Sequence, residues 1–167
     1  YLAEVAEQYK YGRNNGLKYR VIRRAAHNND AEVASLISTL ATEPDFDPTQ
    51  KTLAFEFLCL NHTLLSYIAA LGAHREKIED QEVLTLLDLA VENIQGSLLK
   101  DEAPDLNAQN MLDTIRQRLS SNNKDDQKAL IVLQQLSLML SILNQLSRLK
   151  QSLSHDRDDK ATELASL

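Results

Sequence analysis

Hydrophobic residues recur at three- and four-residue steps along most of this chain, which is the spacing of one face of an α-helix. The first long segment in this register is 17–42, with Val21, Ala25, Val33, Leu36, Ile37 and Leu40. A shorter helix is predicted before "GRNNG" at residues 12–16, where glycine and asparagine favour a break. No alternating strand pattern of useful length occurs, so the chain is predicted to be all-α.

Helix boundaries can be read from capping residues. Asp47, followed by Pro48 and Gln50, predicts the start of a second helix that runs to about Arg75, because Asp caps and Pro suits the first helical position. A third helix is predicted from about Asp80. A shorter fourth helix is predicted around residues 106–119, and a fifth is predicted to begin after an Asn123 cap.

The predicted architecture is an antiparallel helical bundle of about four long helices plus a shorter one. Residues 17–153 are predicted to form the bundle, 1–16 a lead-in segment, and 154–167 a polar tail that is expected to fray. The most regular apolar stripe lies on the fifth helix, at Ala129, Val132, Leu136, Met139, Leu143, Leu146 and Leu153. Its wide apolar face favours a central position in the bundle, and a dimer-forming surface is the alternative use of the same stripe.

Composition narrows the class of protein. Hydrophobic residues make up 43% and charged residues 25% of the 167 residues, which is typical of one globular domain. The single cysteine, Cys59, excludes an internal disulfide and is predicted to be a small buried core residue. No uninterrupted apolar run approaches the roughly 18 residues of a membrane-spanning helix. The chain begins without Met or a helix cap, as an excerpt of a longer protein would.

The net charge of −6 hides an uneven distribution. Residues 1–30 contain six Lys/Arg and three acids, a balance of +3, and the remainder contains 12 Lys/Arg and 21 acids, a balance of −9. Positive charge at one end of a chain can indicate a nucleic-acid site, a membrane surface or an internal partner for the acidic portion.

Two segments, Lys18–Asp30 and Leu60–Glu76, carry polar groups at unusual density. They fall on consecutive predicted helices that we expect to pack together, so their polar side chains can meet. The candidate residues are Tyr19, Arg20, Arg23, Arg24, His27, Asn28, Asp30, Asn61, His62, Tyr67, His74 and Arg75. The favoured interpretation is a network of interhelical hydrogen bonds and ion pairs, because buried polar groups must be satisfied and so occur in sets.

Other kinds of site have weaker support. Arginine forks match carboxylates and phosphates, so an anion site at Arg20, Arg23, Arg24 and Arg75 stays open. His27, His62 and His74 lack the spacing that places two imidazoles on one helix face. Ser66 and His62 are four residues apart, but no oxyanion hole is indicated. Nucleic acid binding is disfavoured because the basic patch is short and aromatics are few. We therefore expect no catalytic residue, metal or cofactor.

The same two segments resemble a known family. The patterns "YR-x-x-RR-x-AHN-x-D-A" and "LNH-x-L-x-Y-x-x-ALG-x-HR", which together span residues 11–76, resemble the C-terminal cytoplasmic region of the fusaric-acid-resistance-like (FUSC) family of bacterial inner-membrane proteins, of the YccS/YhfK type. Beyond residue 75 the likeness is only in character: helical, acidic and leucine-rich.

The resemblance implies a cytoplasmic, non-enzymatic domain that follows transmembrane helices of an inner-membrane efflux or transport protein. Members of the family are linked by name to the export of aromatic carboxylic acids. The expected partners are the rest of the same protein, further copies of it and anionic lipid headgroups, with the basic segment just cytoplasmic of a membrane helix. The alternative function is a ligand-sensing domain that binds an anionic metabolite through the Arg/His cluster.

Overall fold

The computed structural model describes residues 1–13, 16–44, 47–74, 76–99, 106–119 and 124–165, with side chains except those of 106, 124–125 and 153–165. This part of the chain contains helices and no strand, which confirms the all-α prediction. The helices are α1 (Leu2–Tyr11), α2 (Gly16–Ala41), α3 (Pro48–Ala73), α4 (Gln81–Leu99), α5 (Leu106–Arg118) and α6 (Lys124–Ala165).

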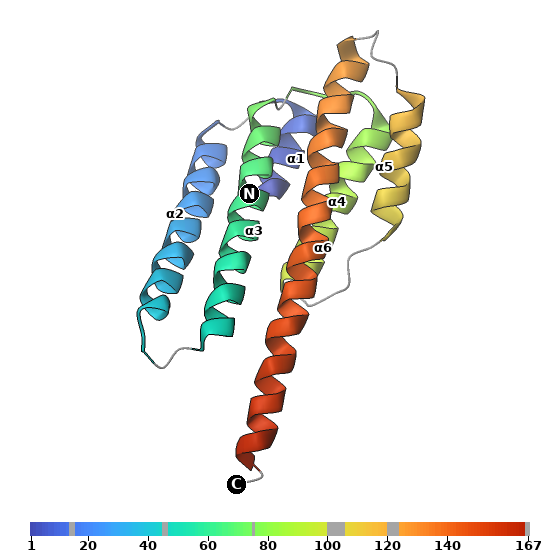
Figure 1. Ribbon diagram of the computed structural model, residues 1–167. Coiled ribbons are helices and arrows are strands. Elements are labelled where there is room, and N and C mark those ends of the chain that lie inside the picture. Colours follow the sequence, from blue (N-terminus) through green and yellow to red (C-terminus); the bar gives the residue numbers. More distant parts are fainter. Residues whose placement is uncertain (14–15, 45–46, 75, 100–105, 120–123, 166–167) are drawn as a thin grey trace.

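Helix α6 is the central helix of the bundle, with α3 packed on one side and α4 and α5 on the other (Figure 1). Its buried stripe includes Val132, Leu136, Met139, Leu143 and Leu146, as predicted, whereas the side chain of Leu153 lies outside the described residues. The predicted central position is therefore confirmed. The helix also continues to Ala165, through the segment that was expected to be a frayed tail.

Helix α1 belongs to the bundle, although the sequence assigned residues 1–16 to a lead-in segment. Val5 and Tyr9 are fully buried against α3 and α4. The Tyr9 hydroxyl donates to the Leu71 carbonyl oxygen at 2.9 Å, and the Ile78 amide donates to the Tyr9 carbonyl at 3.0 Å. The helix ends at Gly12, whose φ is 81°. Glycine adopts this left-handed conformation without strain because it has no Cβ atom.

Two aspartates cap helices at the positions where the sequence predicted helix starts. The Thr49 amide donates to Asp47 Oδ1 at 2.8 Å. This bond satisfies one of the free N–H groups at the start of α3. The Glu82 and Val83 amides donate to Asp80 Oδ1 at 3.0 and 3.2 Å at the start of α4. The other predicted cap, Asn123, lies outside the described residues.

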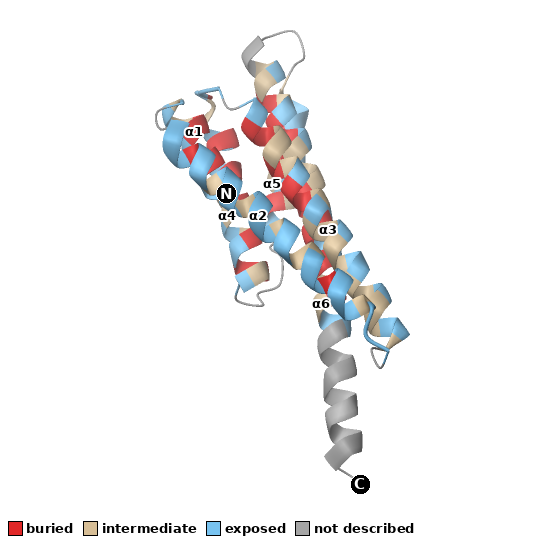
Figure 2. Cartoon of the chain, turned by 90° about the vertical axis from the view of Figure 1, so that its left-hand side faces the viewer, coloured by how far each residue is buried: buried red, intermediate tan, exposed pale blue. Residues whose placement is uncertain are grey.

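Helix α2 packs on α3 with little burial, and only its Tyr19 and Ile37 are classed as buried (Figure 2). The predicted apolar stripe was wrong in part: Val33 and Ile37 face inward, but Val21, Leu36 and Leu40 are exposed. The line that faces α3 instead runs through Tyr19, Ala26, Asp30, Val33 and Ile37. Its central position is a carboxylate, so a pattern of aliphatic residues alone could not identify it.

The buried position predicted for Cys59 was also wrong, because this cysteine is exposed. The inward face of α3 includes Leu64, Ile68 and Leu71. Cys59 lies on the opposite side of the helix at a rotation of about 100° per residue. Phe55 shares that outer side and is exposed as well.

Two described helical segments are long and apolar enough to cross a membrane by length and composition alone, Pro48–Ala73 and Asp126–Ser152. The sequence showed no uninterrupted apolar run of that length, because polar residues are scattered through both segments. A core helix of a soluble bundle passes the same test, and half of the Asp126–Ser152 window is buried within the bundle.

Helices α1, α2 and α3 approach one another closely at Gly72. A Cβ atom at this position would lie 2.6 Å from the Tyr19 hydroxyl, 3.1 Å from the Tyr1 hydroxyl and 3.3 Å from Val5 Cγ2. The absence of a side chain at residue 72 therefore lets the two tyrosines and α1 reach the α3 backbone.

We expect Gly72→Ala to destabilise the chain by about 1–3 kcal/mol, because the added methyl group displaces the Tyr19 hydroxyl from a packed site. The free energy of unfolding in urea measures the effect. Gly16→Ala is the matched control: nothing lies within 4 Å of its added Cβ, so its effect is small or stabilising. Tyr19→Phe combined with Gly72→Ala restores part of the loss, and a full loss in the double variant would contradict the proposed steric cause.

Candidate functional site

The polar residues of α2 and α3 meet at one point, the Asp30 carboxylate. Asn61 Nδ2 donates to Asp30 Oδ1 at 2.9 Å, and His62 Nδ1 lies 2.7 Å from Asp30 Oδ2. The Asp30 side chain is only 10% exposed, whereas that of His62 is 66% exposed. The Asn61 bond is therefore the more shielded of the two, and it joins α2 to α3 through two of the candidate polar residues.

Tyr19 forms a second polar contact of α2, with Tyr1 at the start of α1. Its hydroxyl lies 2.8 Å from that of Tyr1, and the two rings are 5.7 Å apart. The His27 ring lies 6.4 Å from the Tyr1 ring on the same side. Tyr19, Arg23 and His27 follow one another at steps of four residues along α2. Two of them, Tyr19 and His27, lie next to Tyr1 at the start of the chain.

The remaining predicted residues do not converge on Asp30. Arg20 Nε donates to the Gly16 carbonyl of its own helix at 3.1 Å, and Arg23, Arg24 and Asn28 are exposed. Tyr67 is half-buried beside the core, and His74 is exposed at the C-terminal end of α3. Arg75 lies outside the described residues.

The geometry gives no support to the metal and hydrolase interpretations. The described residues contain no group of three or more His, Cys, Asp or Glu that could hold a metal ion. The Ser66 hydroxyl donates to the backbone carbonyl of His62 at 2.9 Å. This bond is within one helix and does not involve the imidazole, so Ser66 and His62 do not form a nucleophile–base pair.

Sequence reasoning missed an ion pair between α1 and α2. Lys18 Nζ lies 2.6 Å from Glu4 Oε2, and Gln8 Nε2 donates to Glu4 Oε1 at 3.2 Å. Burial raises the pKa of Glu4, but the Lys18 ammonium and the Gln8 amide outweigh it, so the pKa lies below its ordinary value. Treating residues 1–16 as a lead-in segment hid this partner of Lys18.

Helix α1 makes a further ion pair with α4. Lys10 Nζ lies 2.7 Å from Asp88 Oδ1, which raises the pKa of Lys10 chiefly through this hydrogen bond. At the far side of α4, Arg118 Nη2 lies 2.7 Å from Asp80 Oδ2 and joins α5 to the cap of α4. Several of the chain's charges therefore serve to hold neighbouring helices together.

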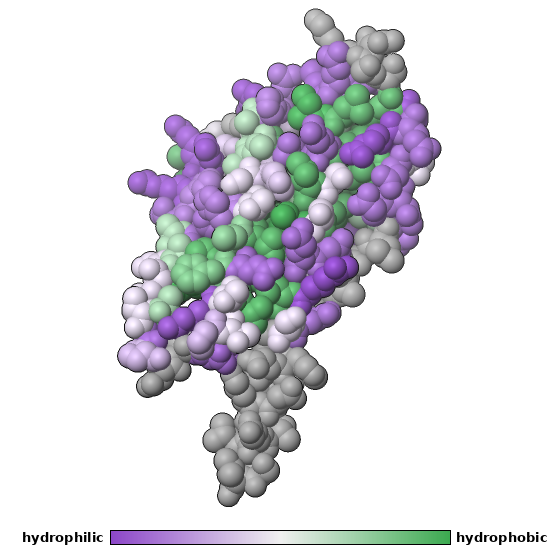
Figure 3. All heavy atoms as spheres, viewed as in Figure 1, coloured by the Kyte–Doolittle hydropathy of each residue, from purple (hydrophilic) through white to green (hydrophobic). Residues whose placement is uncertain are grey.

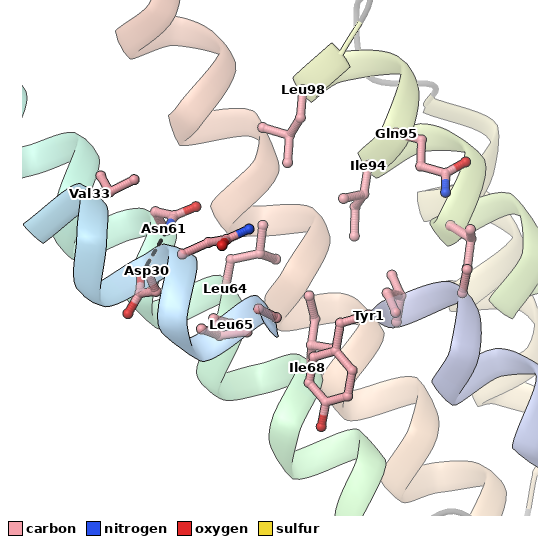
Figure 4. A pocket seen from close by; sticks show the side chains of 15 residues that line it. Tyr1, Asp30, Val33, Asn61, Leu64, Leu65, Ile68, Ile94, Gln95 and Leu98 are labelled. Carbon is pink, nitrogen blue, oxygen red and sulfur yellow. Dashed lines mark hydrogen bonds between the residues drawn. The ribbon is translucent and has the colours of Figure 1, made fainter. Parts of the chain in front are cut away.

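A cavity of about 360 Å³ adjoins the Asp30–Asn61 pair and lies between α1, α2, α3 and α4 (Figure 4). Most of its wall is aliphatic, with Leu64, Ile68 and Ile94 among the lining residues. Among the described residues, no lysine, arginine or histidine lines it, and the one carboxylate in the wall is that of Asp30. The cavity therefore does not suit an anionic carboxylate or phosphate.

The described helices form an all-α bundle, and comparison with known proteins relates the chain to part of an inner membrane protein. The chain is 41% identical over 155 residues to the inner membrane protein YccS of Escherichia coli (strain K12), covering 92% of this chain and 22% of YccS. It is 38% identical over 80 residues to an uncharacterized protein of Haemophilus influenzae (strain ATCC 51907 / DSM 11121 / KW20 / Rd), covering 48% of this chain and 11% of that protein.

Over most of its length this chain is therefore a relative of part of an inner membrane protein, and it spans about a fifth or less of the length of the curated relatives it matches. No family model matches the chain, and no solved structure matches it.

The Asp30–Asn61 bond is expected to couple α2 to α3 energetically. We expect Asn61→Ala to lower the free energy of unfolding by about 1–3 kcal/mol, because it removes the donor to a largely buried carboxylate oxygen. His62→Gln, at an exposed ring, is expected to cost under about 1 kcal/mol. A double-mutant cycle of Asp30→Ala and Asn61→Ala isolates the pair, with an expected coupling of about 0.5–3 kcal/mol. A coupling of zero would show that the two side chains do not hold the helices together.

Glu4 makes the stability of the chain depend on pH. Its pKa is lower in the folded than in the unfolded state. Its contribution is therefore complete above the unfolded-state pKa of about 4.3 and is lost as the pH falls through the folded-state pKa. Urea unfolding of the native chain and of Glu4→Gln, measured from neutral to acidic pH, tests this. The native chain is expected to be the more stable at neutral pH, and the difference narrows in acid. A difference that stays constant with pH would refute the assignment.

Proposed function

We propose that this chain is the C-terminal cytoplasmic, non-enzymatic domain of a FUSC-type inner-membrane transport protein, where it assembles or regulates the membrane-spanning part. The observation that carries the proposal is the 41% identity to an inner membrane protein over 92% of the chain. The two FUSC-like sequence patterns fall on α2 and α3 and contain Asp30, Asn61 and His62, so the residues that mark the family join these two helices.

Helix α2 is the element best suited to carry a regulatory signal. It has only two buried residues over 26, and its polar attachments include the contacts of Asp30, Tyr19 and Lys18. Elements with few buried apolar contacts open at low free-energy cost. A movement of α2 can therefore change the surface that the domain presents to neighbouring helices or subunits, while α6 and its partners stay packed.

Anion sensing has less support as the alternative function. Arg20, Arg23 and Arg24 are exposed and do not line the cavity beside Asp30. A bound carboxylate or phosphate needs several donors that converge on one position. Assembly of homo-oligomers remains part of the proposal, with the membrane-spanning part of the same protein as the first expected partner.

The test uses the full-length protein in bacterial cells, with and without this domain. We expect removal of the domain to raise the cellular retention of a radiolabelled small aromatic carboxylic acid severalfold, although the membrane part is still produced. Asn61→Ala is expected to give a smaller rise, because it loosens only α2. Equal retention with and without the domain would refute a regulatory or assembly role, and a full-length protein that exports none of the acid would refute transport of this substrate class.

The exposed Cys59 reports the side of the membrane in the same cells. A membrane-impermeant maleimide is expected to label Cys59 in inverted membrane vesicles and to leave it unlabelled in intact spheroplasts. Mass spectrometry of the peptide that contains Cys59 gives the readout, with Cys59→Ser as the matched control. Labelling in spheroplasts would contradict the cytoplasmic location.

A further inference from the structure

The positive charge of the chain is concentrated on the first half of α2 and the segment before it. Residues 8–29 contain six Lys/Arg and no Asp or Glu, in a chain whose net charge is −6. Arg20, Arg23 and Arg24 are all exposed. Within the described part of the chain, none of these three arginines forms an ion pair with a carboxylate, unlike Lys18 and Lys10.

Exposed apolar side chains lie among these arginines. Leu17 is 66% and Val21 59% exposed. Residues three or four apart are neighbours on a helix surface, so Leu17, Arg20, Val21 and Arg24 form one continuous face, and Arg23 borders it. We call these five residues the basic face. Leu17, Arg20, Val21 and Arg24 are turned away from the buried Tyr19 and Ile37, and Arg23 lies at the edge of the face, four residues after Tyr19. Hydrophilic atoms cover the upper part of α2 in Figure 3.

We propose that the basic face docks on the anionic phospholipid surface of a membrane. Arginines that flank exposed aliphatic side chains suit the boundary between headgroups and acyl chains, where the aliphatic groups leave water and the guanidinium groups contact phosphates. A nucleic acid would offer phosphates but no apolar layer for Leu17 and Val21, and the five residues of the face include no aromatic ring for base stacking.

The charge distribution also fixes the orientation of the docked domain. Residues 31–167 carry 12 Lys/Arg and 21 Asp/Glu, so an anionic surface repels them while it attracts the basic face. Docking through α2 places that helix between the bilayer and α3. This inference rests on the exposed residues of the basic face and holds whether or not the protein transports aromatic acids.

Co-sedimentation of the purified chain with vesicles tests the proposal. Binding is expected to vesicles of phosphatidylcholine with phosphatidylglycerol, to be weak with phosphatidylcholine alone, and to weaken as added salt screens the charges. Arg20→Gln, Arg23→Gln and Arg24→Gln together are expected to reduce the partition coefficient by about fivefold per arginine, which is on the order of 100-fold in total.

A matched variant separates the basic face from net charge. The control variant also loses three positive charges, from exposed positions outside the basic face: Lys77→Gln, Arg116→Gln and Arg148→Gln. Its vesicle binding is expected to stay within a few-fold of that of the native chain. Leu17→Ser with Val21→Ser is expected to weaken binding without loss of helicity in circular dichroism, because both side chains are already exposed.

Three results would overturn the proposal: no binding to the anionic vesicles, equal binding to both vesicle types, or equal losses in the two triple variants. Each of these results leaves the retention assay of the full-length protein unaffected, so failure of lipid docking is distinguishable from failure of the proposed function.

Discussion

The close approach at Gly72 determines how the first three helices fit together. Because residue 72 has no side chain, the hydroxyl groups of Tyr1 and Tyr19 can both reach the α3 backbone, and Val5 of α1 packs against it. The Tyr9 hydroxyl then bonds the adjacent Leu71 carbonyl, which fixes α1 across the end of α3. From this position α1 also pairs with α2 through Glu4 and with α4 through Lys10, so α1 ties the α2–α3 hairpin to α4, in addition to the direct packing of α3 on α6.

Much of the fold could be predicted from the sequence because the signals were local. Regular apolar spacing identified the long helices, and the cap at Asp47 identified the start of one of them. The regular stripe on α6 predicted its central place, because a helix that is apolar over a wide face must be covered on several sides. The pairing of Asp30 with Asn61 and His62 followed from the polar density on consecutive helices.

The parts that could not be predicted depend on tertiary packing. Val21 and Leu36 are more hydrophobic than Asp30, yet Asp30 faces α3 because Asn61 and His62 supply partners for its carboxylate there. Cys59 is a residue type that is usually buried, but it lies on the side of α3 that no described helix covers. The apolar residues of the short α1, Leu2, Val5, Ala6 and Tyr9, follow helical spacing, but spacing alone does not show which helices cover them.

The helices of the bundle differ in how much apolar side-chain surface they bury. Leu136, Met139 and Leu143 of α6 are completely buried. Each such side chain contributes about 1.5–3 kcal/mol on transfer from water. Helix α2 has the same length as α3 but buries only Tyr19 and Ile37, so polar contacts form a larger share of what holds it. This contrast places α2, with its exposed arginines, at the loosely held edge of the bundle.

The length of α6 sets the span of the molecule along one direction. The helix is continuous from Lys124 to Ala165 and contains 42 residues. At a rise of about 1.5 Å per residue, it is about 60 Å long. It begins near the end of the bundle where α2 also begins, and it runs past the far ends of α2 and α3 (Figure 1). A partner that contacts the last turns of α6 is therefore held far from the arginines of α2. One continuous helix sets the distance between these two surfaces.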